Sequence, residues 1–173
     1  MAYSESQQDI ISSIRSLEIP KKEMILVGGV ALDLFNIRFS KTIDLVVSSD
    51  VMLELLDKAD NKTFHAYSLG HIGTMAQVLA IGKGRDLQTH RGFVSFMPAP
   101  NDHLYQASFE QLRAEAIDTS DILVSPLGRL LDWKQKVGDS VGNQKDLADA
   151  ELIGSHLSNN EQSFETLHQL ISR

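Results

Sequence analysis

The sequence predicts an α/β protein in which a mixed β-sheet flanked by helices is followed by a C-terminal helical portion. Three observations predict this class. A strand, a short helix and a second strand follow one another within residues 23–47, and this order is the nucleus of an α/β fold. Short apolar segments separated by Gly and polar turns occupy the middle of the chain, and about the last fifty residues carry helical periodicity.

The N-terminal part is expected to form a helix and then a strand. Residues 6–17 place isoleucine and leucine at helical spacing, Ser6 stands at the N-cap position, and Pro20 follows as a stop signal. The apolar run 23–29 predicts a short strand that runs into two glycines. Residues 30–37 have the length and pattern of a two-turn helix packed on that strand.

The next strand carries a single acidic residue. In the segment 42–47, alternation places Thr42, Asp44 and Val46 on one face and three apolar residues on the other. We therefore expect one face of this strand to lie in the core and the face with Asp44 to lie toward a surface.

The remaining elements follow from caps, turns and periodicity. They are a helix at 50–59, strands at 63–70, 74–82 and 92–98, a helix of about a dozen residues from "PAPND" to near Ala114, a weak strand or edge segment at 116–125, and helices at 125–138, 143–157 and 159–173.

Length and composition favour one folded domain. A chain of 173 residues is long enough to bury a single sizeable core, and its 42% hydrophobic and 23% charged residues are close to globular averages. We expect one domain over 1–173, with a sheet-containing core at 1–124 and C-terminal helices at 125–173. Internal repeats and low-complexity linkers are absent from the sequence.

Charge and cysteine content exclude several functional classes. The formal net charge of -7 opposes broad nonspecific DNA binding, because such binding depends on Lys and Arg, although a local basic patch for RNA is compatible with it. Without cysteine the chain has no disulfide, thiolate metal site or cysteine nucleophile. The N-terminus lacks a signal-peptide pattern and no apolar run approaches a membrane span, so we expect a cytoplasmic protein without a membrane partner.

Gly28 and Gly29 stand where a strand passes into a helix. The start of a helix offers backbone N–H groups and a partial positive charge to a phosphate. A tight turn that requires small residues explains the same pair without a ligand. The glycines match neither a P-loop nor a dinucleotide fingerprint, so the pair alone does not decide between the two.

The features that surround the glycines resemble a known family. "GGVAL" is followed by "RFSKTIDL", which contains Arg38 and Ser40 ahead of the strand with Asp44. This order resembles the nucleotidyltransferase fold, especially the small bacterial proteins related to abortive-infection toxins and minimal nucleotidyltransferases. The C-terminal third, "ILVSPLGRLLDWKQKVGDSVGNQKDLADAEL", extends the resemblance, with matching positions at Ser125, Pro126, Lys134, Lys145, Asp146 and Asp149.

The resemblance implies transfer of a nucleoside monophosphate from an NTP to an acceptor, with Mg²⁺ as cofactor. It implies that Asp44 is the catalytic and metal-ligating residue, that Thr42 stands at a degenerate metal position, and that the acceptor is RNA, a protein or a small molecule. The residues that it assigns to nucleotide binding are Gly28, Gly29, Arg38, Ser40, Lys134 and Lys145.

This sequence departs from the family pattern at two acidic positions. Active relatives carry two carboxylates on the strand and a third on a later strand, an arrangement that holds two Mg²⁺ ions. Here Thr42 takes the first position, and Ser95 stands near the expected third. Asp33 and Asp102 are the carboxylates considered as spatial substitutes. A neutral hydroxyl supplies neither the charge nor the activating role of a carboxylate.

Three interpretations therefore stay open. The first is a nucleotidyltransferase, with normal or weakened activity. The second is a catalytically degenerate nucleotide-binding, RNA-binding or protein-interaction module of a toxin–antitoxin-like pair. The third is an α/β domain with a coincidental resemblance.

Plain structural roles are also open for four of the C-terminal residues. Lys145 and Asp149 are spaced as an i,i+4 pair, Asp146 suits the start of a helix, and Lys134 could extend along an apolar helix face. The six histidines show no metal-binding spacing, and Arg85, His90 and Arg91 read as a small basic loop or a solvated hairpin.

Overall fold

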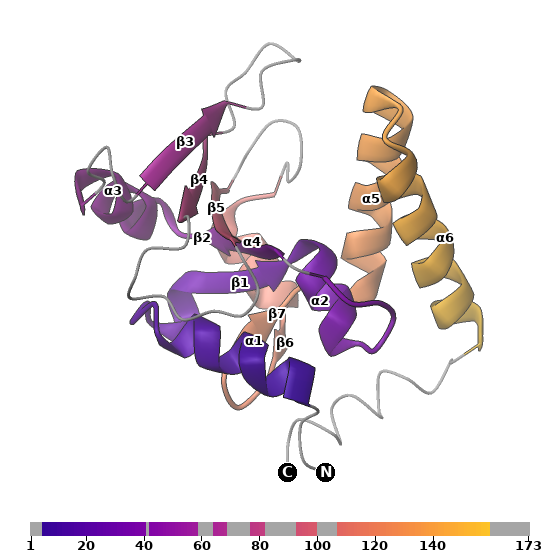
Figure 1. The fold of residues 1–173 in the computed structure, drawn as a ribbon, viewed down its shortest axis with the longest axis horizontal. Helices are drawn as coiled ribbons and strands as arrows, with labels where there is room; N and C mark the ends of the chain where they lie inside the picture. Colours follow the sequence, from indigo (N-terminus) through magenta and orange to yellow (C-terminus); the bar gives the residue numbers. More distant parts are fainter. Residues whose placement is uncertain are drawn as a thin grey trace.

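A computed structural model of the chain describes residues 5–40, 42–58, 64–68, 77–81, 93–99 and 107–159. Figure 1 shows the arrangement of the elements. The helices are α1 (Glu5–Arg15), η1 (Lys21–Glu23), α2 (Gly28–Leu34), α3 (Ser49–Lys58), α4 (Phe109–Glu115), α5 (Leu127–Val141) and α6 (Gln144–Asn159). The strands are β1 (Met24–Val27), β2 (Thr42–Val47), β3 (Phe64–Ser68), β4 (Gln77–Ile81), β5 (Phe93–Pro98), β6 (Ile117–Asp118) and β7 (Leu123–Val124).

The described strands form one mixed sheet in the order β3-β4-β5-β2-β1-β7-β6. The pairs β1–β7 and β2–β5 are parallel, whereas β1–β2, β3–β4, β4–β5 and β6–β7 are antiparallel. The expected mixed sheet flanked by helices, with a C-terminal helical portion, is therefore confirmed. Among the described residues, no helix is both long and apolar enough to cross a membrane.

The register of the three central strands aligns the site-forming residues. Val27, the last residue of β1, pairs with Asp44 of β2, and Asp44 pairs with Ser95 of β5. Paired residues on neighbouring strands place their side chains on the same face of a sheet. Asp44 and Ser95 therefore lie side by side, level with the last residue of β1.

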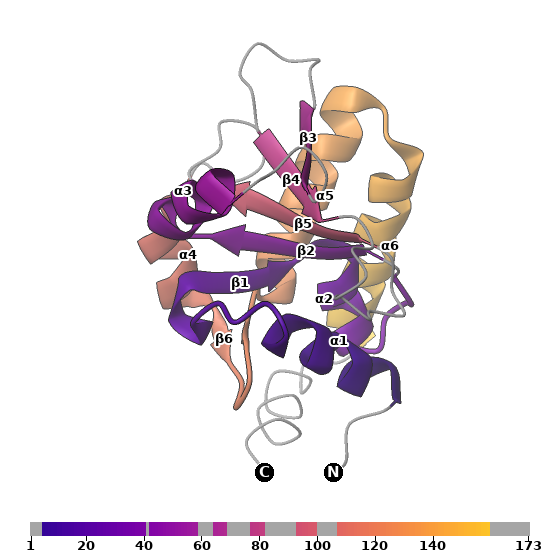
Figure 2. The ribbon, with the colours of Figure 1, turned by 60° about the vertical axis from the view of Figure 1, so that its left-hand side comes forward.

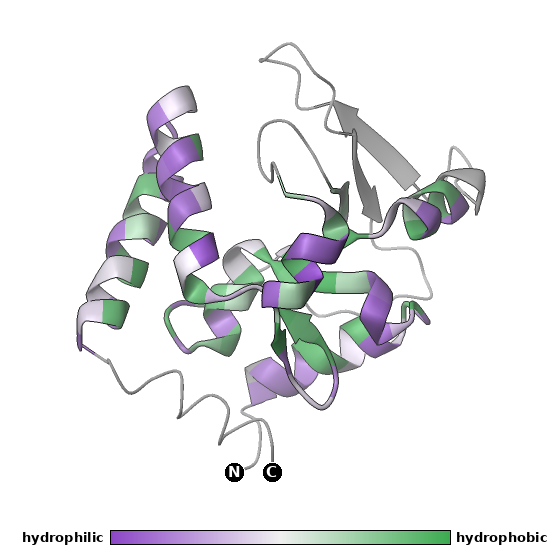
Figure 3. Cartoon of the chain, turned by 180° about the vertical axis from the view of Figure 1, so that it is seen from behind, coloured by the Kyte–Doolittle hydropathy of each residue, from purple (hydrophilic) through white to green (hydrophobic). Residues whose placement is uncertain are grey.

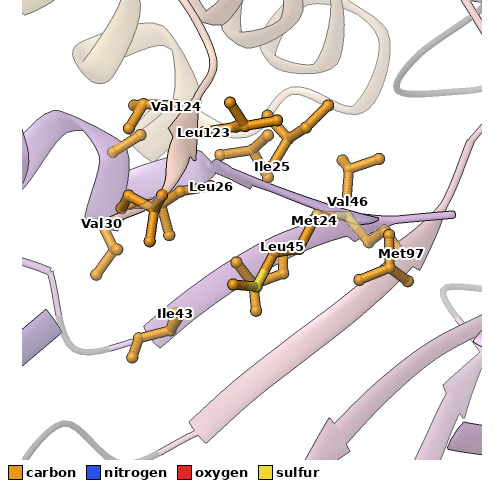
Figure 4. Packing of buried hydrophobic residues seen from close by; sticks show 14 of the residues in the cluster. Met24, Ile25, Leu26, Val30, Ile43, Leu45, Val46, Met97, Leu123 and Val124 are labelled. Carbon is orange, nitrogen blue, oxygen red and sulfur yellow. The ribbon is translucent and has the colours of Figure 1, made fainter. Parts of the chain in front are cut away.

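The face of β2 opposite Asp44 lies in the hydrophobic core. Ile43 and Leu45 are fully buried, and they belong to one apolar cluster with residues of β1, α2, β5, β7, α4 and α5. Figure 4 shows part of this cluster, with Leu26, Val30 and Ile43 packed around the central strands. Burying each such side chain contributes about 1.5 to 3 kcal/mol, so this face fixes the register of β2.

Helix α2 packs against the central strands, and α5 and α6 form a hairpin whose buried residues Leu127, Leu130 and Ile153 belong to the same apolar cluster. In Figure 1, α2 lies between the central strands and the pair formed by α5 and α6, and in Figure 2 these two helices lie behind the strands and α2. In Figure 3 apolar residues concentrate where strands and helices meet, whereas α5 and α6 alternate between apolar and polar residues along their length. The helical hairpin thus faces the side of the sheet on which α2 begins.

Three expected helix starts are corrected. Helix α1 already includes Glu5, so Ser6 lies within it rather than at its N-cap. Helix α2 begins at Gly28 rather than at residue 30, so both glycines belong to its first turn. Helix α4 begins at Phe109 rather than near "PAPND", because Ser108 and Gln111 form a reciprocal capping box at its start. The segment 116–125 forms two short strands, β6 and β7, joined by a turn in which Thr119 bonds Ile122.

Several sequence predictions fall outside the described residues. These are the helix at 159–173 apart from its first residue, Asp102, and the basic loop of Arg85, His90 and Arg91.

Candidate functional site

Asp44 lies against the first glycine of α2. Gly28 has a φ of +65°, a backbone conformation that residues with a Cβ rarely adopt. A Cβ at this position would lie 2.3 Å from Oδ2 of Asp44. The antiparallel register explains this contact, because Asp44 is paired with Val27 and the chain turns over its side chain at the next residue. Glycine is therefore required both by the turn and by the close approach of the carboxylate.

The environment of Asp44 disfavours its charge. Burial raises the pKa of Asp44 to about 6, against the lowering effect of the Lys134 charge, a hydrogen bond from Ser95, the Lys145 charge and a hydrogen bond from the Gly29 amide. Desolvation thus outweighs four favourable interactions. A bound cation would stabilise the charged form of such a carboxylate. Groups with strongly shifted pKa values are common at functional sites.

Gly29 faces the loop that connects α2 to β2. A Cβ on Gly29 would lie 2.6 Å from Oγ of Ser40 and 2.9 Å from Nη2 of Arg38. The backbone N–H of Ser40 donates to Oδ2 of Asp33 at 3.2 Å, which fixes the end of the loop on α2. Arg38 and Ser40 are therefore next to the glycine turn.

Arg38 is held by an acid on α6. Its Nε and Nη2 both donate to the carboxylate of Asp149, the latter over 2.6 Å, and its Nη1 donates to the carbonyl of Phe39 at 3.0 Å. Burial tends to raise the pKa of Asp149, but hydrogen bonds from Arg38 and Lys134 outweigh it and hold that pKa below its usual value. The guanidinium of Arg38 is thus engaged with the protein itself.

Lys134 of α5 is buried between two carboxylates. Its amine contacts Asp146 and lies 3.0 Å from Oδ2 of Asp149, and only 4% of the residue is exposed. Asn143 donates to the other oxygen of Asp146 at 2.6 Å. The alternative in which Lys134 extends along an apolar face is wrong, because its amine ends in an ion cluster.

Lys145 is the exposed cation of the group. It lies in the first turn of α6, one residue before the buried Asp146, and its charge acts on Asp44. The ion pairs of Asp149 found among the described residues are with Arg38 and Lys134, so the expected i,i+4 pair with Lys145 is not formed. Lys145 is the candidate contact for a negatively charged ligand.

The oxygen donors around Asp44 are mostly neutral. Thr42 lies two residues earlier on the same face and is half-buried, and Ser95 is the neighbour on β5. Asp44 pairs with Val27 of β1 and with Ser95 of β5, so neither neighbouring strand has a carboxylate at this register position. In the ranges that the structure describes, no group of three or more His, Cys, Asp or Glu residues could hold a metal ion.

Sequence reasoning found the individual residues and missed their pairing. Nothing in the sequence linked Arg38 to Asp149, which are 111 residues apart. Asp33 was considered as a substitute carboxylate, but it is the acceptor that closes the loop at Ser40. The hydrogen bond from Asn143 to Asp146 could be expected from their spacing of three residues, which is typical of local side-chain contacts at the start of a helix.

Comparisons with known proteins give distant structural matches. No family model and no curated protein sequence matches the chain. The crystal structure of ANT(2")-Ia in complex with adenylyl-2"-tobramycin is 16% identical, with 95% of this chain and 94% of that chain covered and a TM-score of 0.46. The solution structure of the antibiotic-resistance factor ANT(2'')-Ia is 15% identical, with coverages of 95% and 88% and a TM-score of 0.46.

A third solved structure, JHP933 from Helicobacter pylori, is 14% identical to this chain. The match covers 77% of this chain and 57% of JHP933, with a TM-score of 0.36. At these identities and TM-scores, the roles of the residues are argued from the geometry of this chain alone.

Proposed function

We propose that the protein binds a Mg²⁺–nucleoside triphosphate beside Asp44 and transfers the nucleoside monophosphate to an acceptor. The observation that carries this proposal is the position of the Asp44 carboxylate, desolvated between the glycine turn and Ser95 and under the influence of Lys134 and Lys145. Such a carboxylate is suited to a hard cation, and the nearby exposed lysine is suited to the phosphates that accompany it.

The donor set fits one Mg²⁺ delivered with its nucleotide. Mg²⁺ prefers oxygen ligands, keeps several waters, and is commonly held by one or two carboxylates together with substrate phosphates. Asp44 would supply the carboxylate, and the hydroxyls of Thr42 and Ser95 are neutral donors beside it. When bound, the ion would neutralise charge that develops on the phosphates during transfer. The same donors do not fit a centre of two ions.

The residues of the chain then have separate tasks. Gly28 and Gly29 leave room in the first turn of α2 for the Asp44 carboxylate and for Ser40 and Arg38, so these side chains are held at the start of the helix. Lys145 contacts the triphosphate from the start of α6. The acceptor attacks the α-phosphorus and pyrophosphate leaves, and RNA, a protein or a small molecule remains the proposed acceptor class.

A transfer assay tests this function. The protein is incubated with each of the four NTPs labelled at the α-phosphate, Mg²⁺, and total RNA, a protein extract or a small-molecule extract. Label in acid-insoluble material is counted, and acid-soluble products are separated by chromatography. We expect transfer by the wild type and by Asp132→Asn, a control on the exposed side of α5, and none by Asp44→Asn. Equal labelling by wild type and Asp44→Asn would contradict the proposal.

A second candidate function is nucleotide binding without transfer. The observation that favours it is the neutral row around Asp44, in which Thr42 and Ser95 stand where an active centre would need charge. Under this function wild type binds Mg²⁺–NTP and transfers nothing, whereas Thr42→Asp gains transfer. If wild type transfers nucleotide and Asp44→Asn does not, binding without transfer is ruled out.

A further inference from the structure

The carboxylate of Asp149 joins three elements that are far apart in sequence. It accepts hydrogen bonds from Nε and Nη2 of Arg38, which lies in the loop between α2 and β2. Its Oδ2 lies 3.0 Å from the amine of Lys134 on α5. Asp149 itself is on α6 and is 2% exposed. A single buried group therefore connects the glycine turn's loop to both helices of the C-terminal hairpin.

The charges of this cluster balance among themselves. Arg38 and Lys134 are the two cations, and Asp146 and Asp149 are the two carboxylates, with Asn143 completing the hydrogen bonds of Asp146. Buried charges persist only where partners and hydrogen bonds compensate for the loss of water. Because the buried amine of Lys134 lies between two protein carboxylates, a direct contact with a ligand's phosphate would require it to leave them. Asp149 fixes the orientation of the Arg38 guanidinium through two of its N–H groups.

The cluster also borders the site on two sides. On one side, Nη2 of Arg38 is so close to Gly29 that a Cβ there would lie 2.9 Å from it. On the other side, Asp146 is the immediate chain neighbour of Lys145, the exposed cation that acts on Asp44. The distance between the glycine turn and Lys145 is therefore set through this cluster.

We propose that Asp149 is a positioning residue that locks Arg38 and Lys134 into one unit and thereby holds Lys145 of the α5–α6 hairpin in range of Asp44. Lys134 then acts through the protein, and Lys145 is the cation that contacts the triphosphate. The part that concerns the triphosphate rests on the proposed function. The mechanical part, the locking of the loop to the hairpin, does not.

A double-mutant cycle on the full chain tests the part that concerns the ligand. The affinity for each of ATP, GTP, CTP and UTP with Mg²⁺ is measured by titration calorimetry for wild type, Asp149→Asn, Lys145→Met and the double variant. We expect Asp149→Asn to weaken binding about tenfold in the wild-type background and less than about twofold when Lys145 is already replaced, because coupled residues are not additive.

The control is an ion pair of the same geometry away from the site. Arg129 and Glu115 form a two-bonded pair at 2.7 and 2.6 Å on the surface, and Glu115→Gln is expected to leave nucleotide affinity unchanged. If Asp149→Asn does not fold, Arg38→Lys replaces it in the cycle, since it keeps the charge but not the two-bonded fork. Equal losses of affinity in both backgrounds would overturn the positioning role while leaving nucleotide binding intact.

Hydrogen exchange tests the mechanical part without any nucleotide. Asp149→Asn, or Arg38→Lys, should speed amide exchange at residues 36–40 and in the first turn of α6, whereas Glu115→Gln should change neither region. Unchanged exchange in the loop would overturn the proposal even if nucleotide binds. If wild type binds no NTP but the loop and the hairpin loosen together, the proposed function fails and the locking role of Asp149 stands.

Discussion

Oδ2 of Asp44 occupies the space next to Gly28 so closely that a Cβ on this glycine would lie 2.3 Å from it. The antiparallel pairing of Val27 with Asp44 brings the two together, and the φ of +65° at Gly28 turns the chain across the carboxylate. This contact partly removes Asp44 from water, and burial is the main cause of its raised pKa. The turn and the acid therefore form one unit.

The contact predicts the effect of enlarging the glycine. Gly28→Ala should lower the free energy of unfolding by about 2 kcal/mol or more, because alanine is strained by about 1 to 2 kcal/mol in the left-handed conformation and its Cβ also collides with Asp44. Denaturation in urea measures the change. Gly128→Ala on α5 is the control, because no atom lies within 4 Å of the added Cβ, and it should be stabilising by about 0.5 to 1 kcal/mol.

The raised pKa predicts a pH-dependent gain in stability when Asp44 loses its charge. The folded protein binds the Asp44 proton with a pKa of about 6, against an ordinary value of 3.8, so the folded state is favoured below pH 4 and loses this contribution as pH rises through 6. Asp44→Asn should match wild type near pH 4 and exceed its stability by up to about 3 kcal/mol above pH 6.

The measurement is the difference in free energy of unfolding between Asp44→Asn and wild type, from urea denaturation at several pH values. Asp132→Asn, on the exposed face of α5, serves as a control and should show no comparable rise. A difference that stays flat from pH 4 to pH 8 would show that Asp44 is not desolvated by the glycine turn.

The two lysines should separate stability from binding. Lys134→Met removes the cation from between two buried carboxylates and should cost about 3 to 5 kcal/mol of stability. Lys145→Met alters an exposed side chain and should change stability by less than about 0.5 kcal/mol, yet weaken Mg²⁺–NTP binding about tenfold. Thermal denaturation and calorimetry distinguish the two. Stability losses of similar size would contradict the assignment of Lys145 as an exposed ligand contact.

Local sequence patterns predict the elements around the site well, because short-range rules decide them. Alternation along β2 placed Ile43 and Leu45 in the core and Asp44 on the other face, and all three lie as expected. Apolar burial on one face fixes such a strand without information from distant residues. The start of α4 was missed because the reciprocal bonds of Ser108 and Gln111 had not been recognised as a capping box.

Long-range pairing could not be read in the same way. The residues beside Gly29 were identified by resemblance, but the pairing of Arg38 with Asp149 depends on how α6 lies against the loop. Lys134 looked like a residue of an amphipathic helix, because the two carboxylates that surround it come from a different helix. Tertiary packing therefore determines which cation of the set stays exposed, and in this protein it is Lys145.

The measurement that tests the central claim most directly is calorimetric titration of wild type and Asp44→Asn with each NTP, at pH 7.5, with and without Mg²⁺. At this pH the Asp44 carboxylate of the free protein is ionised. We predict that wild type binds at least one NTP in a Mg²⁺-dependent manner and that Asp44→Asn, although folded and more stable, loses this binding. Binding of equal strength by both proteins, or no binding by wild type, would contradict a nucleotide site at Asp44.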